Sequence, residues 1–217
     1  MSTVRTEAAQ GPGALRLVDS RTTGPASVDF TEYVAAMSVH CPYLAPSVRH
    51  GLTGWTVYEA VGEPSAVEAE VFRLGVEFAE RVRGLAKRPR GSLVCENIAV
   101  FGAGREVLAW PHWALKNLYA PVGVMFGKFP TGEQGTDHLG RQVPEPPVSF
   151  LVVRAAVPVR DPRFLSRTPD LAATVAASAD DGRDVFAAQR LPRTWTKVKR
   201  WAQRRLPDRQ RAEGRQP

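Results

Sequence analysis

The sequence predicts an α+β domain built on a single sheet of about four or five strands, with helices packed mainly on one face. Two patterns favour this fold class. Apolar runs of strand length recur between Gly- and Pro-rich turns, as at residues 92–101, which is typical of buried strands. Residues 64–85 carry apolar side chains at steps of three or four with Glu and Arg between them, which is the pattern of an amphipathic helix.

The N-terminal half predicts a leader, a helix and a strand before that long helix. Residues 1–26 mix Gly, Pro, Ser, Thr, Arg and Ala without periodicity, so we expect a disordered leader. Ser27 is a suitable N-cap for a first helix with apolar residues at helical spacing, and this helix should end before Pro42. Residues 55–61 are rich in β-branched and aromatic side chains and predict a strand. We expect a globular domain over residues 27–180.

The C-terminal half of this domain predicts a helix around Pro111, the strands that complete the sheet, and the starts of two short helices at residues 161–162 and 168–170. Pro111 is expected to open the helix, which ends before Pro121. One strand contains Gly123 and Gly127, which indicates close approach of another backbone or a ligand. A Gly- and Pro-rich loop precedes the last strand. The strands are predicted at residues 92–101, 122–129 and 148–157.

The positive charge of the chain is concentrated in its last segment. The formal net charge is +7, but residues 187–217 hold ten Lys or Arg against two acidic residues, which leaves nineteen basic and twenty acidic residues before them. We expect residues 181–217 to be a basic, partly helical or disordered tail. A nearly neutral domain argues against a nucleic-acid groove in the fold, so nucleic acid, an acidic membrane surface or an acidic protein would be bound through the tail alone.

Other function classes lack their sequence signals. No apolar run is long enough to span a membrane, and the N-terminus has no secretory signal. The two cysteines, Cys41 and Cys95, make a disulfide framework improbable, and we expect a cytoplasmic protein. Phosphate-binding glycine loops, nucleophile elbows and paired zinc-ligand motifs are absent from the sequence.

The turn His40-Cys41-Pro42-Tyr43 places two potentially reactive or metal-binding side chains, His40 and Cys41, next to each other. An imidazole or a thiolate from this turn is a ligand type for haem iron, and the proline fixes the backbone after the cysteine. The alternative is a buried cysteine that packs as a small apolar side chain beside a histidine that caps the first helix. His112, in an aromatic setting, is a further candidate ligand or acid–base group, and its alternative is a packed histidine bonded to a backbone carbonyl.

Lys128 and Arg154 are isolated charges in apolar strands and are the candidate binding residues for a substrate carboxylate. An isolated charge in a buried run needs a partner. Glu96 or Asn97 in a neighbouring strand could supply it, in which case the pair is purely structural.

Three segments of the chain resemble a known group of sequences. They are the Cys41-Pro42-Tyr43 turn, the run "LKNLYAPVGVMFGKF" at residues 115–129 and the run "PPVSFLVVRAAVPVRDPRFL" at residues 146–165. Together they resemble an uncharacterised actinobacterial family associated with natural-product gene clusters, over a little more than half of the chain. Members of that family often have His where Ala155 stands here, so a role for that position does not carry over.

A fainter similarity, in the early Pro/Cys turn, a "SLV" strand and a late apolar strand, is to the YqcI/YcgG-like family, some members of which are haem-dependent enzymes that oxygenate an amine nitrogen. The resemblances imply a tailoring enzyme for a small carboxylate- or amine-bearing substrate, with haem held by His112, His40 or Cys41. The alternative is a non-catalytic ligand- or partner-binding accessory protein with a basic tail. A homodimer is compatible with either hypothesis.

Overall fold

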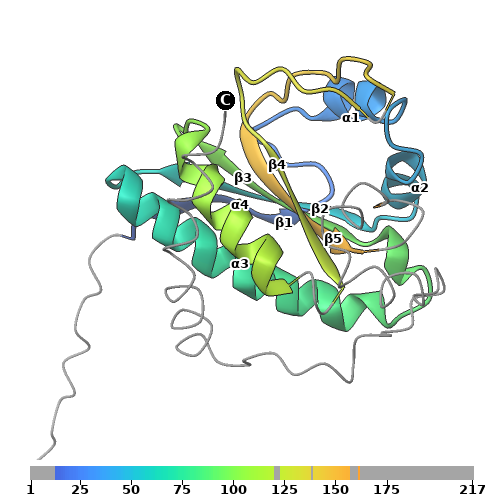
Figure 1. Ribbon diagram of the computed structural model, residues 1–217, viewed down its shortest axis with the longest axis horizontal. Coiled ribbons are helices and arrows are strands. Elements are labelled where there is room, and N and C mark those ends of the chain that lie inside the picture. The colour runs from blue at the N-terminus through green and yellow to red at the C-terminus, as the bar shows by residue number, and fades with distance from the viewer. Residues whose placement is uncertain (1–12, 120–122, 138, 157–160, 162–217) are drawn as a thin grey trace, which may run out of the picture.

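The computed structural model describes residues 13–119, 123–137, 139–156 and 161. Its five strands form one mixed sheet in the order β1-β2-β3-β5-β4, which confirms the α+β class (Figure 1). Three of the four strand pairs are antiparallel, and the central pair of β2 and β3 is parallel. The strands are β1 (Leu15–Thr22), β2 (Thr53–Ala60), β3 (Cys95–Phe101), β4 (Val124–Phe129) and β5 (Ser149–Ala155).

The first strand corrects the expected extent of the leader. Residues 15–22, predicted to belong to a disordered segment, form β1 at one edge of the sheet. The prediction failed because β1 has no alternation of apolar and polar side chains: Leu17 and Val18 are neighbours and both are exposed. The strand is held instead by antiparallel backbone pairing to β2, with two shifts of register.

The parallel pair is joined by the long helix α3 (Pro64–Ala86), whose bounds match the predicted 64–85 closely. The proline stands at the first turn, where its missing N–H costs nothing. After α3 a short 3₁₀ turn (Gly91–Leu93) leads into β3. Parallel neighbours need such a crossover because the chain has to return to the same end of the sheet.

The two longest helices cover one face of the sheet. α3 and α4 (Glu106–Tyr119) pack on Ile98, Val100, Leu151 and Val153 in the larger core. Helix α4 begins five residues before the proline that was predicted to open it, so Pro111 lies inside the helix. The two helices approach closely at Gly75, where a Cβ would lie 2.2 Å from Cδ1 of Leu115.

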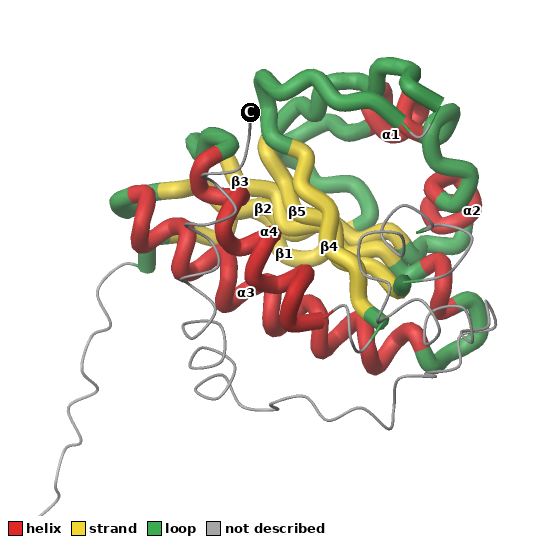
Figure 2. Tube along the Cα trace, viewed as in Figure 1, coloured by secondary structure: helices red, strands yellow, loops and turns green. Residues whose placement is uncertain are grey.

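The opposite face is covered by residues 23–52, which we call the cap (Figures 1 and 2). The cap contains the predicted helix α1 (Thr31–Met37) and a second helix, α2 (Leu44–Arg49), in a segment where only a turn was predicted. Its apolar residues Val28, Phe30, Tyr33 and Met37 pack on one face of the sheet. They contact Trp55, Val57, Ala99 and Phe150, and also Val148, the residue before β5. The site described below lies under this layer.

No helix among the described residues is both long and apolar enough to cross a membrane. The predicted basic tail at 181–217, the two short helices predicted to start at 161–162 and 168–170 (Asp161 apart) and the first twelve residues of the leader lie outside the described residues.

Candidate functional site

An aromatic cavity of about 230 Å³ lies between the cap and the sheet. Its walls come from both layers, so only the folded domain can form it. From the cap come Tyr33, Val34, Met37, Cys41, Tyr43, Leu44 and Ser47, and from the sheet come Thr53, Trp55, Cys95, Asn97, Phe126, Gly127, Phe129, Phe150, Val152 and Arg154.

Aromatic rings in mutual contact form one wall of this cavity. The ring of Phe150 meets Tyr33 edge to face with 5.7 Å between centroids, and it stacks on Phe129 at 4.9 Å. Trp55 stacks on Phe30 at 3.6 Å and also meets Phe150 at 5.1 Å. Aromatic pairs in these geometries are worth about 0.5–1.5 kcal/mol each beyond their buried area. The cavity wall is therefore part of the stable core that holds the cap on the sheet.

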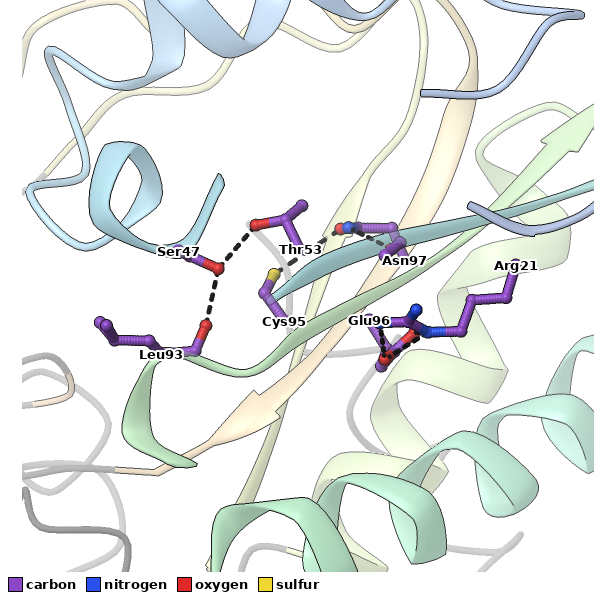
Figure 3. Close-up of polar contacts among 8 residues, drawn as sticks. Arg21, Ser47, Thr53, Leu93, Cys95, Glu96 and Asn97 are labelled. Carbon is purple, nitrogen blue, oxygen red and sulfur yellow. Dashed lines mark hydrogen bonds and ion pairs between the residues drawn. The ribbon is translucent and has the colours of Figure 1, made fainter. Parts of the chain in front are cut away.

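Most polar groups at the cavity have protein partners (Figure 3). The Ser47 hydroxyl donates to the carbonyl oxygen of Leu93 at 2.7 Å and lies 2.6 Å from the Thr53 hydroxyl. The Asn97 amide donates to the carbonyl oxygen of Gly54 at 2.9 Å, and its own oxygen lies 3.9 Å from the Cys95 thiol. These groups are satisfied by the fold and leave little hydrogen-bonding capacity for an occupant of the cavity.

The hydroxyl group of Tyr33 is different. Tyr33 lines the cavity and is 8% exposed, and its hydroxyl oxygen is buried with no hydrogen-bond partner among the described residues. Burial raises the pKa of Tyr33 above its ordinary value, so the group is a neutral phenol that can donate a hydrogen bond to an acceptor. A buried hydroxyl without a partner costs about 1–3 kcal/mol.

Arg154 reaches the cavity from β5 but its charge is already balanced. Its guanidinium binds the Asp161 carboxylate through both terminal nitrogens, at 3.0 and 2.5 Å, and it also donates to the carbonyl oxygen of Ala155. Burial lowers the pKa of Arg154, but the hydrogen bonds and the charge of Asp161 outweigh this effect and raise it. The predicted partner for this charge, Glu96 or Asn97, is thus corrected to Asp161.

Glu96 lies on the other face of the sheet and pairs with Arg21 of β1 (Figure 3). The carboxylate is fully buried and accepts two hydrogen bonds from the Arg21 Nε, at 2.8 and 3.0 Å. The pair lies against Gly54, where a Cβ would come within 2.7 Å of both side chains. This ion pair ties the edge strand to the centre of the sheet.

The residues predicted from the sequence occupy three places. Cys41 and Arg154 line the aromatic cavity, and neither Cys41 nor Cys95 forms a disulfide bond in the described part of the chain. His40 and Lys128 line a second hollow beside it. Lys128 pairs in register with Leu151, whereas Arg154 pairs with Met125, so the two cations stand on opposite faces of the sheet.

His112 lies in α4, on the face away from the cap. Its Nε2 is 3.1 Å from the carbonyl oxygen of Phe126, as the packed-histidine alternative describes. Burial, together with the charges of Lys116 and Lys128, lowers the pKa of His112 to about 4. The imidazole is therefore neutral near pH 7, and it does not share a cavity with His40 or Cys41.

Sequence reasoning missed the groups that define both hollows. Tyr33 was recognised only as an apolar position of the first helix, and Asp137 and Asp161 lie in segments without periodicity. Asp137 pairs with His40, 97 residues away in sequence, which no spacing rule within one segment could have found. Asp161 lies only seven residues after its partner Arg154, but no periodic pattern links the two.

Within the described part of the chain, no three His, Cys, Asp or Glu side chains gather in a way that could hold a metal ion. Comparisons with family models, curated proteins and solved structures find no match to this chain.

Proposed function

We propose that the aromatic cavity binds a small neutral molecule, with a single ring or an apolar body of similar size and one hydrogen-bond acceptor such as an ester, ketone or amide carbonyl. The observation that carries this proposal is the Tyr33 hydroxyl, a buried donor without a described partner at the wall of an otherwise apolar cavity. A ligand acceptor would satisfy it.

The size of the cavity limits the ligand. An engineered apolar cavity of roughly 150 Å³ in another protein binds benzene, and drug-sized ligands use pockets of about 300–1,000 Å³. A volume of about 230 Å³ lies between these values and suits one ring with a short substituent. The stacked side chains of Phe129 and Phe150 provide faces for such a ring.

The charge of the cavity also limits the ligand. Arg154 was predicted to hold a substrate carboxylate, but its bidentate pair with Asp161 leaves the local charge near neutral. A carboxylate ligand would have to compete with Asp161 for the guanidinium and lose its own hydration. A neutral acceptor need not compete with Asp161 and loses much less hydration free energy than a carboxylate, so we favour a carbonyl compound.

The family resemblance and the haem-dependent oxidation that it implies stay predictions. Of the proposed iron ligands only Cys41 lines this cavity, while His40 and His112 lie elsewhere, and a haem macrocycle is larger than the cavity. These residues do not fit a haem here, and the proposal uses none. Titration of the purified protein with hemin tests the prediction directly, because a thiolate or imidazole ligand would shift and sharpen the Soret band of free hemin.

The binding proposal is tested with two small aromatic ligands, methyl benzoate and ethylbenzene, of which only methyl benzoate has hydrogen-bond acceptors. We expect both to bind in ligand-observed NMR titrations. Tyr33→Phe should weaken methyl benzoate about three- to tenfold, the value of one net hydrogen bond, and leave ethylbenzene unchanged. Tyr58→Phe is the matched control, since Tyr58 faces the other core.

A second variant fills the cavity. A Cβ at Gly127 would lie 3.3 Å from the Phe129 ring and 3.8 Å from the Val152 Cβ, so a side chain fits with a small adjustment of that ring. Gly127→Val should weaken both ligands strongly, because β-branched residues suit a strand and the added methyl groups occupy ligand space. Failure of the wild-type protein to bind either ligand would refute the proposal.

A further inference from the structure

A second hollow of about 430 Å³ lies where the end of α1 meets the loop after β4. We call it the histidine hollow. It is lined by His40 from the cap, Lys128 and Phe129 from β4, and Glu133, Asp137 and Pro144 from the loop, among others. It shares the side chains of Met37 and Phe129 with the aromatic cavity as a common wall.

The carboxylate of Asp137 is held as an anion at this hollow. Its Oδ1 accepts the backbone N–H groups of Leu139 and Arg141, both at 2.9 Å, and its Oδ2 accepts the Arg141 Nε at 2.7 Å. Burial raises the pKa of Asp137, but the hydrogen bonds from His40, Arg141 and Leu139 outweigh this effect and hold the pKa well below its ordinary value. The carboxylate is therefore an acceptor with a fixed position.

This carboxylate orients His40. The Nδ1 of His40 lies 2.9 Å from the Asp137 Oδ2, and an ionised carboxylate can only accept. The proton of the neutral imidazole is thus on Nδ1, which leaves the lone pair on Nε2. No described residue forms a hydrogen bond with Nε2, and the imidazole is 13% exposed. A histidine fixed by a carboxylate with its other nitrogen free is the arrangement of a general base.

We propose that His40 and Asp137 form a proton-accepting site in the histidine hollow, which binds small molecules with an acidic O–H or N–H group, such as phenols. The proton moves from the phenol oxygen to Nε2 of His40, which gives an imidazolium beside Asp137 and a phenolate in the hollow. Lys128 also lines this hollow, with its ammonium group 3.5 Å from the Glu133 carboxylate.

The site is separate from the aromatic cavity and does not depend on the function proposed for it. The charges at the hollow balance: Lys128 faces Glu133, and Arg141 faces Asp137. Transfer of one proton within the bound complex converts the neutral phenol and the neutral His40 imidazole into an ion pair, beside charged residues that are already in place. No oxidant or other reactant is needed, since the step is a proton transfer.

The test uses 4-nitrophenol, whose phenolate is coloured, and 4-nitroanisole, which has no acidic proton, as probes of the full-length protein. We expect bound 4-nitrophenol to show a larger phenolate fraction than the free probe at the same pH. His40→Gln should abolish this excess and weaken 4-nitrophenol about tenfold, with 4-nitroanisole unaffected. His50→Gln is the matched control, because His50 is exposed and lines neither hollow.

Two measurements keep the result decisive if His40→Gln is poorly folded. The ¹⁵N shifts of the His40 ring in the wild-type protein should show the tautomer protonated on Nδ1, and both nitrogens protonated after addition of 4-nitrophenol. Tyr33→Phe, at a residue that lines the aromatic cavity and not the histidine hollow, should leave 4-nitrophenol binding unchanged. The proposal is overturned if the free protein has the proton on Nε2, if both probes respond equally to His40→Gln, if wild-type protein binds no 4-nitrophenol, or if Tyr33→Phe weakens its binding, which would place the probe in the aromatic cavity.

Discussion

The buried hydroxyl of Tyr33 predicts that one substitution will change stability and ligand affinity in opposite directions. Tyr33→Phe removes the oxygen and keeps the ring, so its edge-to-face contacts with Phe30 and Phe150 persist. In the unliganded protein the oxygen is buried without a described partner. Its removal should therefore cost no protein hydrogen bond.

The magnitude follows from the cost of a buried group without a partner, about 1–3 kcal/mol. We take the lower end, and expect Tyr33→Phe to raise the free energy of unfolding by about 1 kcal/mol. For a domain of this size that corresponds to a Tm higher by about 2–4 °C. The same substitution should weaken methyl benzoate, because the donor that would bind its carbonyl is gone.

The assay is urea unfolding of both proteins, with the slope of free energy against denaturant compared to confirm that the transition itself is unchanged. Tyr58→Phe gives the background of a tyrosine that does not line the cavity. A loss of more than about 1 kcal/mol on Tyr33→Phe would refute the reasoning, because it would show that the hydroxyl forms a stabilising hydrogen bond within the folded chain.

Three further predictions concern the scaffold. Gly75→Ala should lower the free energy of unfolding by about 1–2 kcal/mol, because its Cβ would meet Leu115 in the core. Gly84→Ala on the same helix has open space around the new Cβ and should raise the free energy of unfolding by up to about 1 kcal/mol. Thermal melts of the two variants test whether the effects have opposite signs. Glu96→Gln should cost about 1–2 kcal/mol, because it removes a buried charge whose partner Arg21 is partly exposed to solvent. Glu59→Gln, in an exposed pair with Arg16, should change little, and equal losses in urea unfolding would contradict this. His112 has a pKa of about 4 in the folded protein and about 6.5 in the unfolded chain, so the unfolded chain binds more protons between these pH values. The free energy of unfolding should therefore fall by up to about 3 kcal/mol as the pH drops from about 6.5 to about 4. Unfolding at a series of pH values should show this slope, and His112→Gln should flatten it.

The strongly patterned elements of the fold could be predicted from the sequence. The 3.6-residue period of α3 reflects burial of one face of the helix, and the apolar runs of β3 and β5 reflect burial of both faces of the strands. Buried positions require apolar side chains, so these patterns are visible in the sequence. β1 and α2 were missed because little of either is buried: most of β1 is exposed, and Ser47 is the buried residue of α2. Their geometry comes from pairing and packing with the rest of the chain.

The candidate sites were only partly predictable for a related reason. Cys41, His40, Lys128 and Arg154 were identified by chemical type, and the structure places each of them at one of two adjoining hollows. Their partners could not be identified, because an ion pair such as that of Arg154 with Asp161 depends on three-dimensional position. Chemical type shows which residues can react, and only the fold shows which are already occupied.

The path of the cap has a consequence for how a ligand would enter. The cap leaves the sheet after Thr22 and returns at Thr53, and Thr22 pairs in register with Trp55, so both of its ends are anchored at one corner. Outward movement of the cap about that corner would leave every strand paired, but it would have to separate Phe30 from Trp55 and Tyr33 from Phe150. Ligand exchange would then need only local opening, with amide hydrogens of α1 exchanging faster than those of β3 and slowing when a ligand binds.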